Sequence, residues 1–127
     1  MRRVTICTAA AVAAVAAGGV ATQAGAKPDA AATTLKLKAA ASGALKFNKS
    51  TLRAERGRVT IKLRNPSSAG KPHAVEVEGK GVEKASRTIQ PGQRTRLRVR
   101  LERGRYEFYC PVGNHQAAGM EGTLIVK

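Results

Sequence analysis

The segment YEFYCPVGNHQAAGMEGTLIVK, residues 106–127, determines how the rest of the chain is interpreted, because it concentrates side chains that bind metals. Cys110, His115 and Met120 place a thiol, an imidazole and a thioether in one short stretch, with four residues between each consecutive pair. Taken singly, each of these residue types is more often structural than ligating. Their combination at this spacing predicts a metal-binding loop.

The donor set favours copper over other common metals. Thiolate and thioether are soft ligands that suit Cu(I), and imidazole binds both oxidation states of copper. A four-ligand site needs one more donor than these three residues supply. The only other histidine in the chain is His73. With His73 added, the set has the composition of a blue-copper electron-transfer centre. Zinc is a weaker alternative, because thioether is a poor zinc ligand.

The N-terminal residues 1–26 have the layout of an export signal. Two arginines at positions 2 and 3 precede an Ala/Val-rich run, and Ala24-Gly25-Ala26 forms a small-x-small cleavage site. We expect cleavage after Ala26 and an exported protein, in the periplasm, the cell envelope or the medium. A membrane anchor is the alternative, but the run is short and alanine is only weakly apolar. Twin-arginine export of a folded chain is a second alternative.

Composition limits both the architecture and the partners. A chain of 127 residues has room for one domain. The formal charge of +15 suggests nucleic acid or an anionic surface, and export argues against nucleic acid. Cleavage would leave Cys110 as the only cysteine. An unpaired cysteine in an exported chain is either a reactive thiol or a metal ligand, and we favour the ligand.

The residue pattern of the mature chain predicts short strands. Residues 27–34 have no periodic pattern and are expected to form a flexible lead-in to a single domain at 35–127. Apolar and polar residues then alternate in short runs separated by glycine and proline, for example at Leu35 and Leu37, at Leu45 and Phe47, and from Val59 to Leu63. This period of two predicts antiparallel strands. We expect an all-β fold, a Greek-key β-sandwich of seven to eight strands.

Strand parity indicates where the proposed ligands point. His73 shares a face with Val75 and Val77, and Cys110 shares a face with Phe108. Both side chains therefore aim inward from strand ends, and we expect them to meet at one pole of the sandwich, under the 111–120 loop.

Other residues have competing interpretations. Tyr106 follows LERGR in the pattern of a tyrosine corner. Tyr109 is expected to face outward in a half-exposed packing role. Arg94, Arg96, Arg98 and Arg100 line one face of a strand. A solvated outer face is the plain interpretation, and the alternative is a surface that steers an acidic redox partner or lies against an anionic envelope.

The chain resembles the cupredoxins, the plastocyanin-like and azurin-like blue-copper proteins. The resemblance is most specific in GRYEFYCPVGNHQAAGMEGTLIV, and NPSSAGKPHAVEVEG is similar to the segment with the family's first histidine. It implies that His73, Cys110, His115 and Met120 are the metal ligands, and that His115 is the electron port. It also makes Tyr109 a counterpart of a surface tyrosine on a second electron route. Many members have asparagine directly after the first histidine, and here the residue is Ala74.

These observations predict an exported, monomeric copper protein that carries one electron between redox partner proteins and is not an enzyme. Two histidines cannot build the further copper centres that an oxidase needs. The principal alternative is a protein that buffers or delivers copper without redox turnover. A cell-surface interaction module with a vestigial site is a third possibility.

Overall fold

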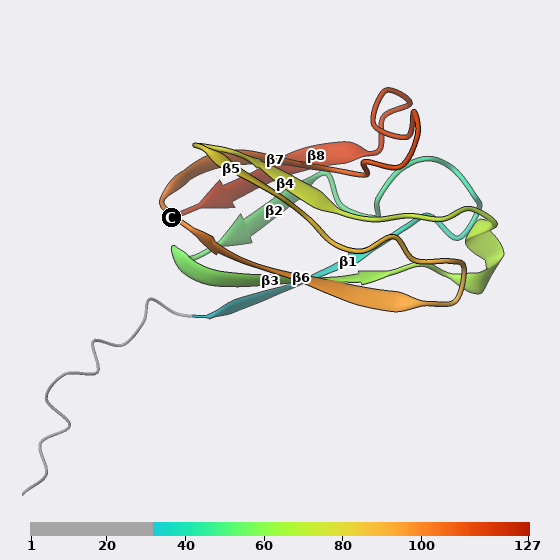
Figure 1. Ribbon diagram of the computed structural model, residues 1–127, viewed down its shortest axis with the longest axis horizontal. Helices are drawn as coiled ribbons and strands as arrows, with labels where there is room; N and C mark the ends of the chain where they lie inside the picture. Colours follow the sequence, from blue (N-terminus) through green and yellow to red (C-terminus); the bar gives the residue numbers. More distant parts are fainter. Residues whose placement is uncertain (1–31) are drawn as a thin grey trace, which may run out of the picture.

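The computed structural model describes residues 32–127, which form two β-sheets packed face to face (Figure 1). The expected export signal at 1–26 and most of the expected lead-in lie outside the described residues. Eight strands and one 3-10 turn follow one another in this part of the chain: β1 (Thr33–Lys38), β2 (Thr51–Ala54), β3 (Gly57–Arg64), η1 (Ser67–Ala69), β4 (Glu76–Gly79), β5 (Val82–Ala85), β6 (Arg94–Leu101), β7 (Gly104–Tyr109) and β8 (Glu121–Val126). The prediction of an all-β sandwich is confirmed. Within residues 32–127, no helix has the length and apolar character needed to cross a bilayer.

The chain crosses repeatedly between the two sheets. One sheet has the order β1-β3-β6, and the other has the order β2-β8-β7-β4-β5. The sequence predicts antiparallel pairs throughout, but β1 pairs with β3 and β2 pairs with β8 in parallel. A parallel pair requires a crossover connection. Here the chain forms at least one strand of the opposite sheet before it returns to pair in parallel. β1 begins at Thr33, two residues before the expected start of the domain.

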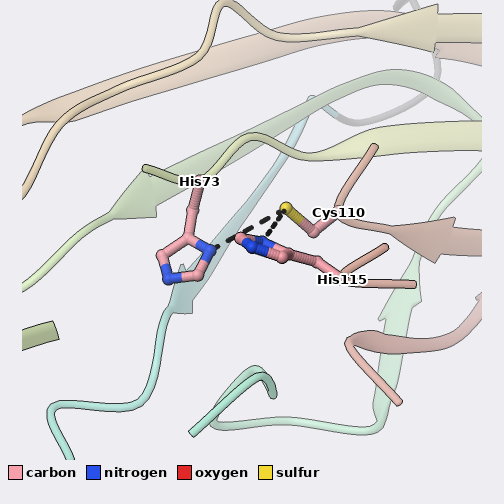
Figure 2. Close-up of side chains that lie close together, drawn as sticks. All are labelled: His73, Cys110 and His115. Carbon is pink, nitrogen blue, oxygen red and sulfur yellow. Dashed lines mark hydrogen bonds between the residues drawn. The ribbon is translucent and has the colours of Figure 1, made fainter. Parts of the chain in front are cut away.

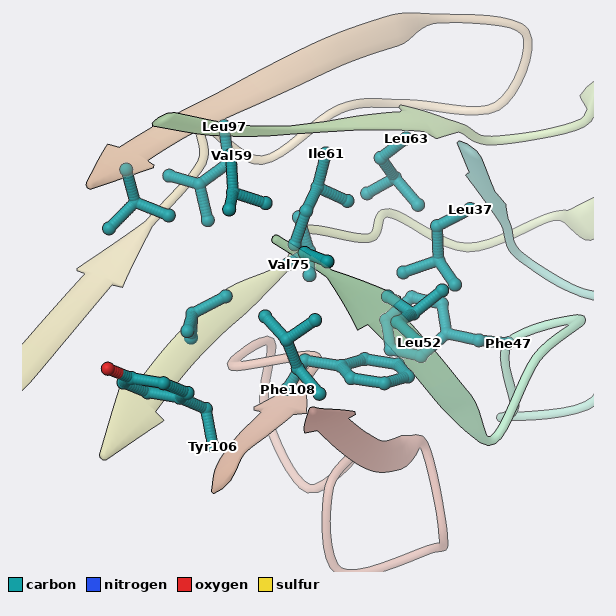
Figure 3. Close-up of a cluster of buried hydrophobic side chains, with 14 of the residues drawn as sticks. Leu37, Phe47, Leu52, Val59, Ile61, Leu63, Val75, Leu97, Tyr106 and Phe108 are labelled. Atoms are coloured by element: carbon teal, nitrogen blue, oxygen red, sulfur yellow. The ribbon is translucent and has the colours of Figure 1, made fainter. Parts of the chain in front are cut away.

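Alternating residues of the two sheets fill the space between them with aliphatic side chains (Figure 3). In β3, Val59, Ile61 and Leu63 are at most 1% exposed, while the intervening residues face outward. Phe108 of β7 is fully buried opposite them. Burying one such side chain stabilises the fold by about 1.5–3 kcal/mol, so this interior supplies the main force that holds the sheets together.

The segment around Leu45 and Phe47 does not form the strand that its alternation predicts. It makes only an isolated bridge, between Ala39 and Phe47. Phe47 is nevertheless buried, and its ring lies 5.7 Å from that of Phe108 in a tilted arrangement. The alternation of apolar and polar residues at this position therefore indicates which side chains are buried, but it does not indicate a strand.

The two tyrosines of β7 have different roles. The hydroxyl of Tyr106 donates a hydrogen bond of 2.9 Å to the carbonyl of Glu102, which confirms the tyrosine corner. Tyr109 is only 7% exposed, so the expectation of a half-exposed side chain is wrong. Its hydroxyl donates to the carboxylate of Glu78, on the neighbouring strand β4, at 2.9 Å.

Replacing Tyr106 by phenylalanine should lower the free energy of unfolding by about 1–2 kcal/mol, because it leaves a partly buried carbonyl without its donor. The matched control is Tyr109→Phe, which deletes the same atom from the same strand. Glu78 is exposed and can bond to water instead, so the control should lose no more than about 0.5 kcal/mol. Urea unfolding measures both values, and equal losses would contradict the corner's role.

Candidate metal centre

Three of the predicted ligands meet at one end of the sandwich (Figure 2). The Sγ atom of Cys110 lies 3.8 Å from Nδ1 of His73 and 3.5 Å from Nδ1 of His115. The donor atoms of all three residues lie within 4.8 Å of one another. His73 and Cys110 are fully buried, and His115 is 9% exposed. The structure thus forms one compact cluster from segments that are 37 residues apart in sequence.

His73 is held in place through its backbone. Its N–H donates to the carbonyl of Ile89 at 3.0 Å, and the N–H of Ile89 donates back to the carbonyl of His73 at 2.8 Å. Asn65, which is fully buried at the end of β3, strengthens this bridge. Its side-chain amide donates to the carbonyls of Lys71 at 2.7 Å and Ile89 at 3.2 Å. Asn65 therefore connects the segment before His73 to the segment that pairs with it.

The sequence alone does not reveal this positioning role of Asn65. The sign of this role in the sequence is that Asn65, a polar residue, directly follows a strand whose alternate residues are buried. Its two acceptors, however, are carbonyls at Lys71 and Ile89, and the second of these is 24 residues away in sequence. Only the folded chain shows that they are neighbours.

Among the backbone hydrogen bonds of the loop between β7 and β8, three involve the predicted ligands. The N–H of Cys110 donates to the carbonyl of Met120, and the N–H of Met120 donates to the carbonyl of His115, both at 3.0 Å. The N–H of His115 donates to the carbonyl of Val112, also at 3.0 Å. Met120 is fully buried. These bonds fix the three loop residues relative to one another through the main chain.

The environment keeps both imidazoles neutral. Burial lowers the pKa of His73 from 6.5 to about 4, with further contributions from the nearby charges of His115 and Lys71. Burial and Lys71 also lower the pKa of His115. A histidine must be neutral to bind a metal, so near neutral pH both rings are already in the binding form.

The sulfur of Cys110 is subject to opposing effects. Burial raises the pKa of the thiol, while hydrogen bonds from the backbone N–H groups of Ala74 and Val112 act in the opposite direction. These two donors favour the thiolate. A bound cation favours it much more strongly and deprotonates a coordinating thiol. Metal binding at this cluster is therefore expected to release a proton.

The support around the His73 ring differs from the usual arrangement, in which a metal-binding histidine donates its second N–H to an acceptor. Among residues 32–127, Nε2 of His73 is buried without a hydrogen-bond partner. Ala74, where many cupredoxins have asparagine, is buried and offers no side-chain hydrogen bond. The ring is thus oriented by packing and by the backbone bridge to Ile89.

The cluster fits a copper ion on chemical and geometric grounds. Two neutral imidazole nitrogens and one sulfur form the trigonal part of a blue-copper site. In zinc sites, whose ion is also divalent, nitrogen and sulfur ligands lie about 2.0 and 2.3 Å from the metal, and with open bond angles they are about 3.5–3.7 Å from each other. The two nitrogen-to-sulfur distances of 3.8 and 3.5 Å match this separation.

The shifted pKa of His73 makes a prediction for the metal-free protein. Because its pKa is lower in the folded than in the unfolded chain, the unfolded state binds more protons as the pH falls below 6.5. Stability from this group is therefore complete above 6.5 and is lost as the pH falls towards 4. Between pH 7 and about pH 4.5 the loss should be about 2–3 kcal/mol.

Urea unfolding of the metal-free protein at both pH values measures this loss, and His73→Gln is the control. The variant has no imidazole at this position, so its stability should fall by less over the same interval. The same fall in both proteins would show that His73 does not carry the effect.

Comparison with known proteins agrees with this geometry. A family model described as copper-binding proteins of the plastocyanin/azurin family matches residues 33–127. A comparison with curated proteins finds no match.

Solved structures with the same fold include two auracyanins. Dithionite-reduced auracyanin from Roseiflexus castenholzii is 19% identical, with 76% of this chain and 98% of that chain covered and a TM-score of 0.68. Auracyanin A, a blue copper protein from Chloroflexus aurantiacus, is also 19% identical, with 76% and 100% covered and a TM-score of 0.63. A copper nitrite reductase from Nitrosomonas europaea is 20% identical over 76% of this chain and 42% of its own, with a TM-score of 0.61.

The family match extends over nearly the whole described chain and includes the histidine and cysteine cluster. The resemblance found in the sequence is thereby confirmed. The chain belongs to the plastocyanin/azurin family of copper-binding proteins, and its cofactor is a type 1 copper ion.

Proposed function

We propose that this protein is an exported carrier of single electrons, in which His73, Cys110, His115 and Met120 hold one copper ion. The supporting observation is the cluster of two imidazoles and one cysteine that residues 32–127 form at the end of the sandwich. When bound, copper supplies a one-electron couple between Cu(II) and Cu(I). In this proposal His73 and His115 would bind as neutral imidazoles through Nδ1, Cys110 would bind as thiolate, and Met120 would supply a weaker thioether donor.

The contribution of the chain is to hold these donors nearly still. Cu(II) and Cu(I) prefer different geometries, and a trigonal set with a long axial bond is acceptable to both. His73 is fixed by its bridge to Ile89, and the other three residues are fixed by the backbone bonds of the loop. With little rearrangement needed on reduction or oxidation, electron transfer meets a small structural barrier.

The loop also provides a surface for electron exchange. His115 is 9% exposed, and the loop residues beside it include exposed Pro111, Ala117 and Ala118. Small uncharged side chains reduce the number of charged groups that a partner protein must desolvate as it approaches the imidazole edge. The charge of Lys71 also lies near this edge, since it lowers the pKa of His115. We propose that electrons enter and leave through His115 at this apolar pole.

The remaining parts of the proposal concern location and partners. Residues 1–26 are proposed to act as a cleaved export signal, and the domain is proposed to work as a monomer. Without Arg2 and Arg3 of the proposed signal, the formal charge falls from +15 to +13, and it favours acidic redox partners because oppositely charged proteins associate faster. A carrier is preferred over an enzyme because two histidines provide ligands for only one such centre.

Adding Cu(II) to the purified protein should produce an intense blue absorption band and a type 1 spin-resonance signal. Cys110→Ser should abolish both, because the thiolate is the ligand that gives the site its blue-copper character. Tyr109→Phe is the matched control: it alters the residue beside Cys110 without changing a proposed donor and should remain blue. A colourless protein at saturating Cu(II) would overturn the ligand assignment.

Carrier and copper-delivery functions can be separated with the loaded protein. A carrier should give a fast, reversible one-electron wave in voltammetry and should retain its copper when mixed with a chelator. Ready transfer of copper to the chelator, with slow or irreversible electrochemistry, would instead support buffering or delivery.

The apolar pole makes a separate prediction about electron exchange. Ala118→Glu places a charge where the partner must dock, and the electron self-exchange rate constant should fall by about tenfold, which corresponds to about 1.4 kcal/mol. The control is Ala32→Glu, the same change at an exposed residue that precedes β1, at the opposite end of the sandwich. NMR line broadening in mixed oxidised and reduced samples measures both rates. Equal slowing in both variants would contradict exchange at the pole.

A further inference from the structure

The charges of this protein are divided between its two sheets. The strands β1, β3 and β6 carry no aspartate or glutamate and contain nine exposed cationic residues: Lys36, Lys38, Arg58, Lys62, Arg64, Arg94, Arg96, Arg98 and Arg100. We call their outward side the basic face. The strands of the other sheet carry charges of both signs: five carboxylates, Glu76, Glu78, Glu83, Glu107 and Glu121, and three cations, Arg53, Lys84 and Arg105. This separation is stronger than a merely soluble surface requires, since interspersed charges of both signs would serve that purpose.

The strand register aligns the cations in rows. Lys36, Lys62 and Arg96 lie side by side across the three strands, and Lys38, Arg64 and Arg94 form the next row. Like charges directly opposite one another in a sheet are destabilising. Neighbouring strands lie about 4.8 Å apart, and alternate residues along a strand lie about 6.8 Å apart. The basic face is thus a regular array of positive charges that the fold maintains at a cost in stability.

Both rows border a wide, shallow hollow of about 740 Å³. Arg87 and Asn48 extend its rim beyond the strands. The guanidinium of Arg87 donates to the carbonyl of Arg94 at 3.3 Å, so this added cation is held next to the second row. A ligand in the hollow would contact cations on several sides at once.

From this array we propose that the basic face binds a linear polyanion that carries phosphate groups. Each phosphate within such a chain has two unbridged oxygens that share one negative charge, and cations on two adjacent strands can each bond to one of these oxygens. Binding would be electrostatic, because the outward residues of these strands other than the cations are threonines and not apolar side chains.

The same composition argues against other occupants. A protein partner usually meets an interface with an apolar, aromatic-rich centre, and the strands of this sheet contain no aromatic residue. The lack of aromatics also removes the stacking platform used for single-stranded nucleic acid. A bilayer is flat, whereas adjacent strands twist by about 20–25°, so a flexible polymer can follow the array better than a membrane surface can.

This assignment goes beyond electron transfer and does not depend on it. The basic face lies on the three-stranded sheet, while the metal loop projects from the other sheet, on the side away from β1, β3 and β6 (Figure 1). A polymer bound to the basic face would therefore leave His115 accessible. The protein could stay attached to an anionic polymer and still exchange electrons through its pole.

The test uses the copper-loaded protein and a long-chain inorganic polyphosphate. The variant Lys36→Gln/Lys62→Gln/Arg96→Gln removes one row of the basic face. The control Arg53→Gln/Lys84→Gln/Arg105→Gln removes three exposed cations from the other sheet and changes the net charge equally. Affinity is measured by titration calorimetry at several salt concentrations, and the copper spectrum confirms that each variant is folded.

The row variant should bind polyphosphate at least about tenfold more weakly than the control, and the slope of log affinity against log salt should fall by about one per lost contact. Equal weakening in both variants would mean that only net charge matters and would overturn the assignment. So would the absence of binding near 0.15 M salt, tighter binding to polyglutamate of matched length, or tighter binding to vesicles of anionic phospholipid.

Discussion

The approach of the His73 imidazole to the Cys110 thiol is the contact on which the site depends. The two residues are 37 positions apart, and their donor atoms are 3.8 Å apart. That distance exists only because the two sheets pack over a shared aliphatic interior and the segment 65–73 turns back at one end. The buried amide of Asn65 and the bridge to Ile89 then hold His73 in place. Core packing thus sets the geometry of the metal centre.

Burial gives the site its chemistry as well as its shape. The same exclusion of water lowers the pKa of His73 and raises that of Cys110. The imidazoles are consequently ready to bind a cation, whereas the thiol must lose its proton when the cation arrives. A bound cation compensates the negative charge of the buried thiolate and therefore favours loss of the thiol proton.

The surface proposed for electron exchange and the face proposed for polyanion binding lie on different parts of the molecule. At the pole, small uncharged side chains of the loop lie beside His115, the proposed ligand with the largest exposed fraction. The cations of β1, β3 and β6 lie on a different surface. The alternation of each strand makes this possible, because one set of side chains builds the core and the other set is free to carry charge. The surface proposed for electron exchange and the face proposed for polyanion binding therefore share no residues.

The sequence by itself determined the local features: the strand periods, the tyrosine corner and the ligand types, because these depend on residues close together in the chain. It also predicted the inward aim of His73 and Cys110 through parity. It could not show that Leu45 and Phe47 lie outside any strand, or that β1 pairs with β3 in parallel. Those outcomes, the burial of Tyr109 and the brace by Asn65 were decided only by tertiary structure, because each involves contacts between segments whose separation in the chain gives no local signal.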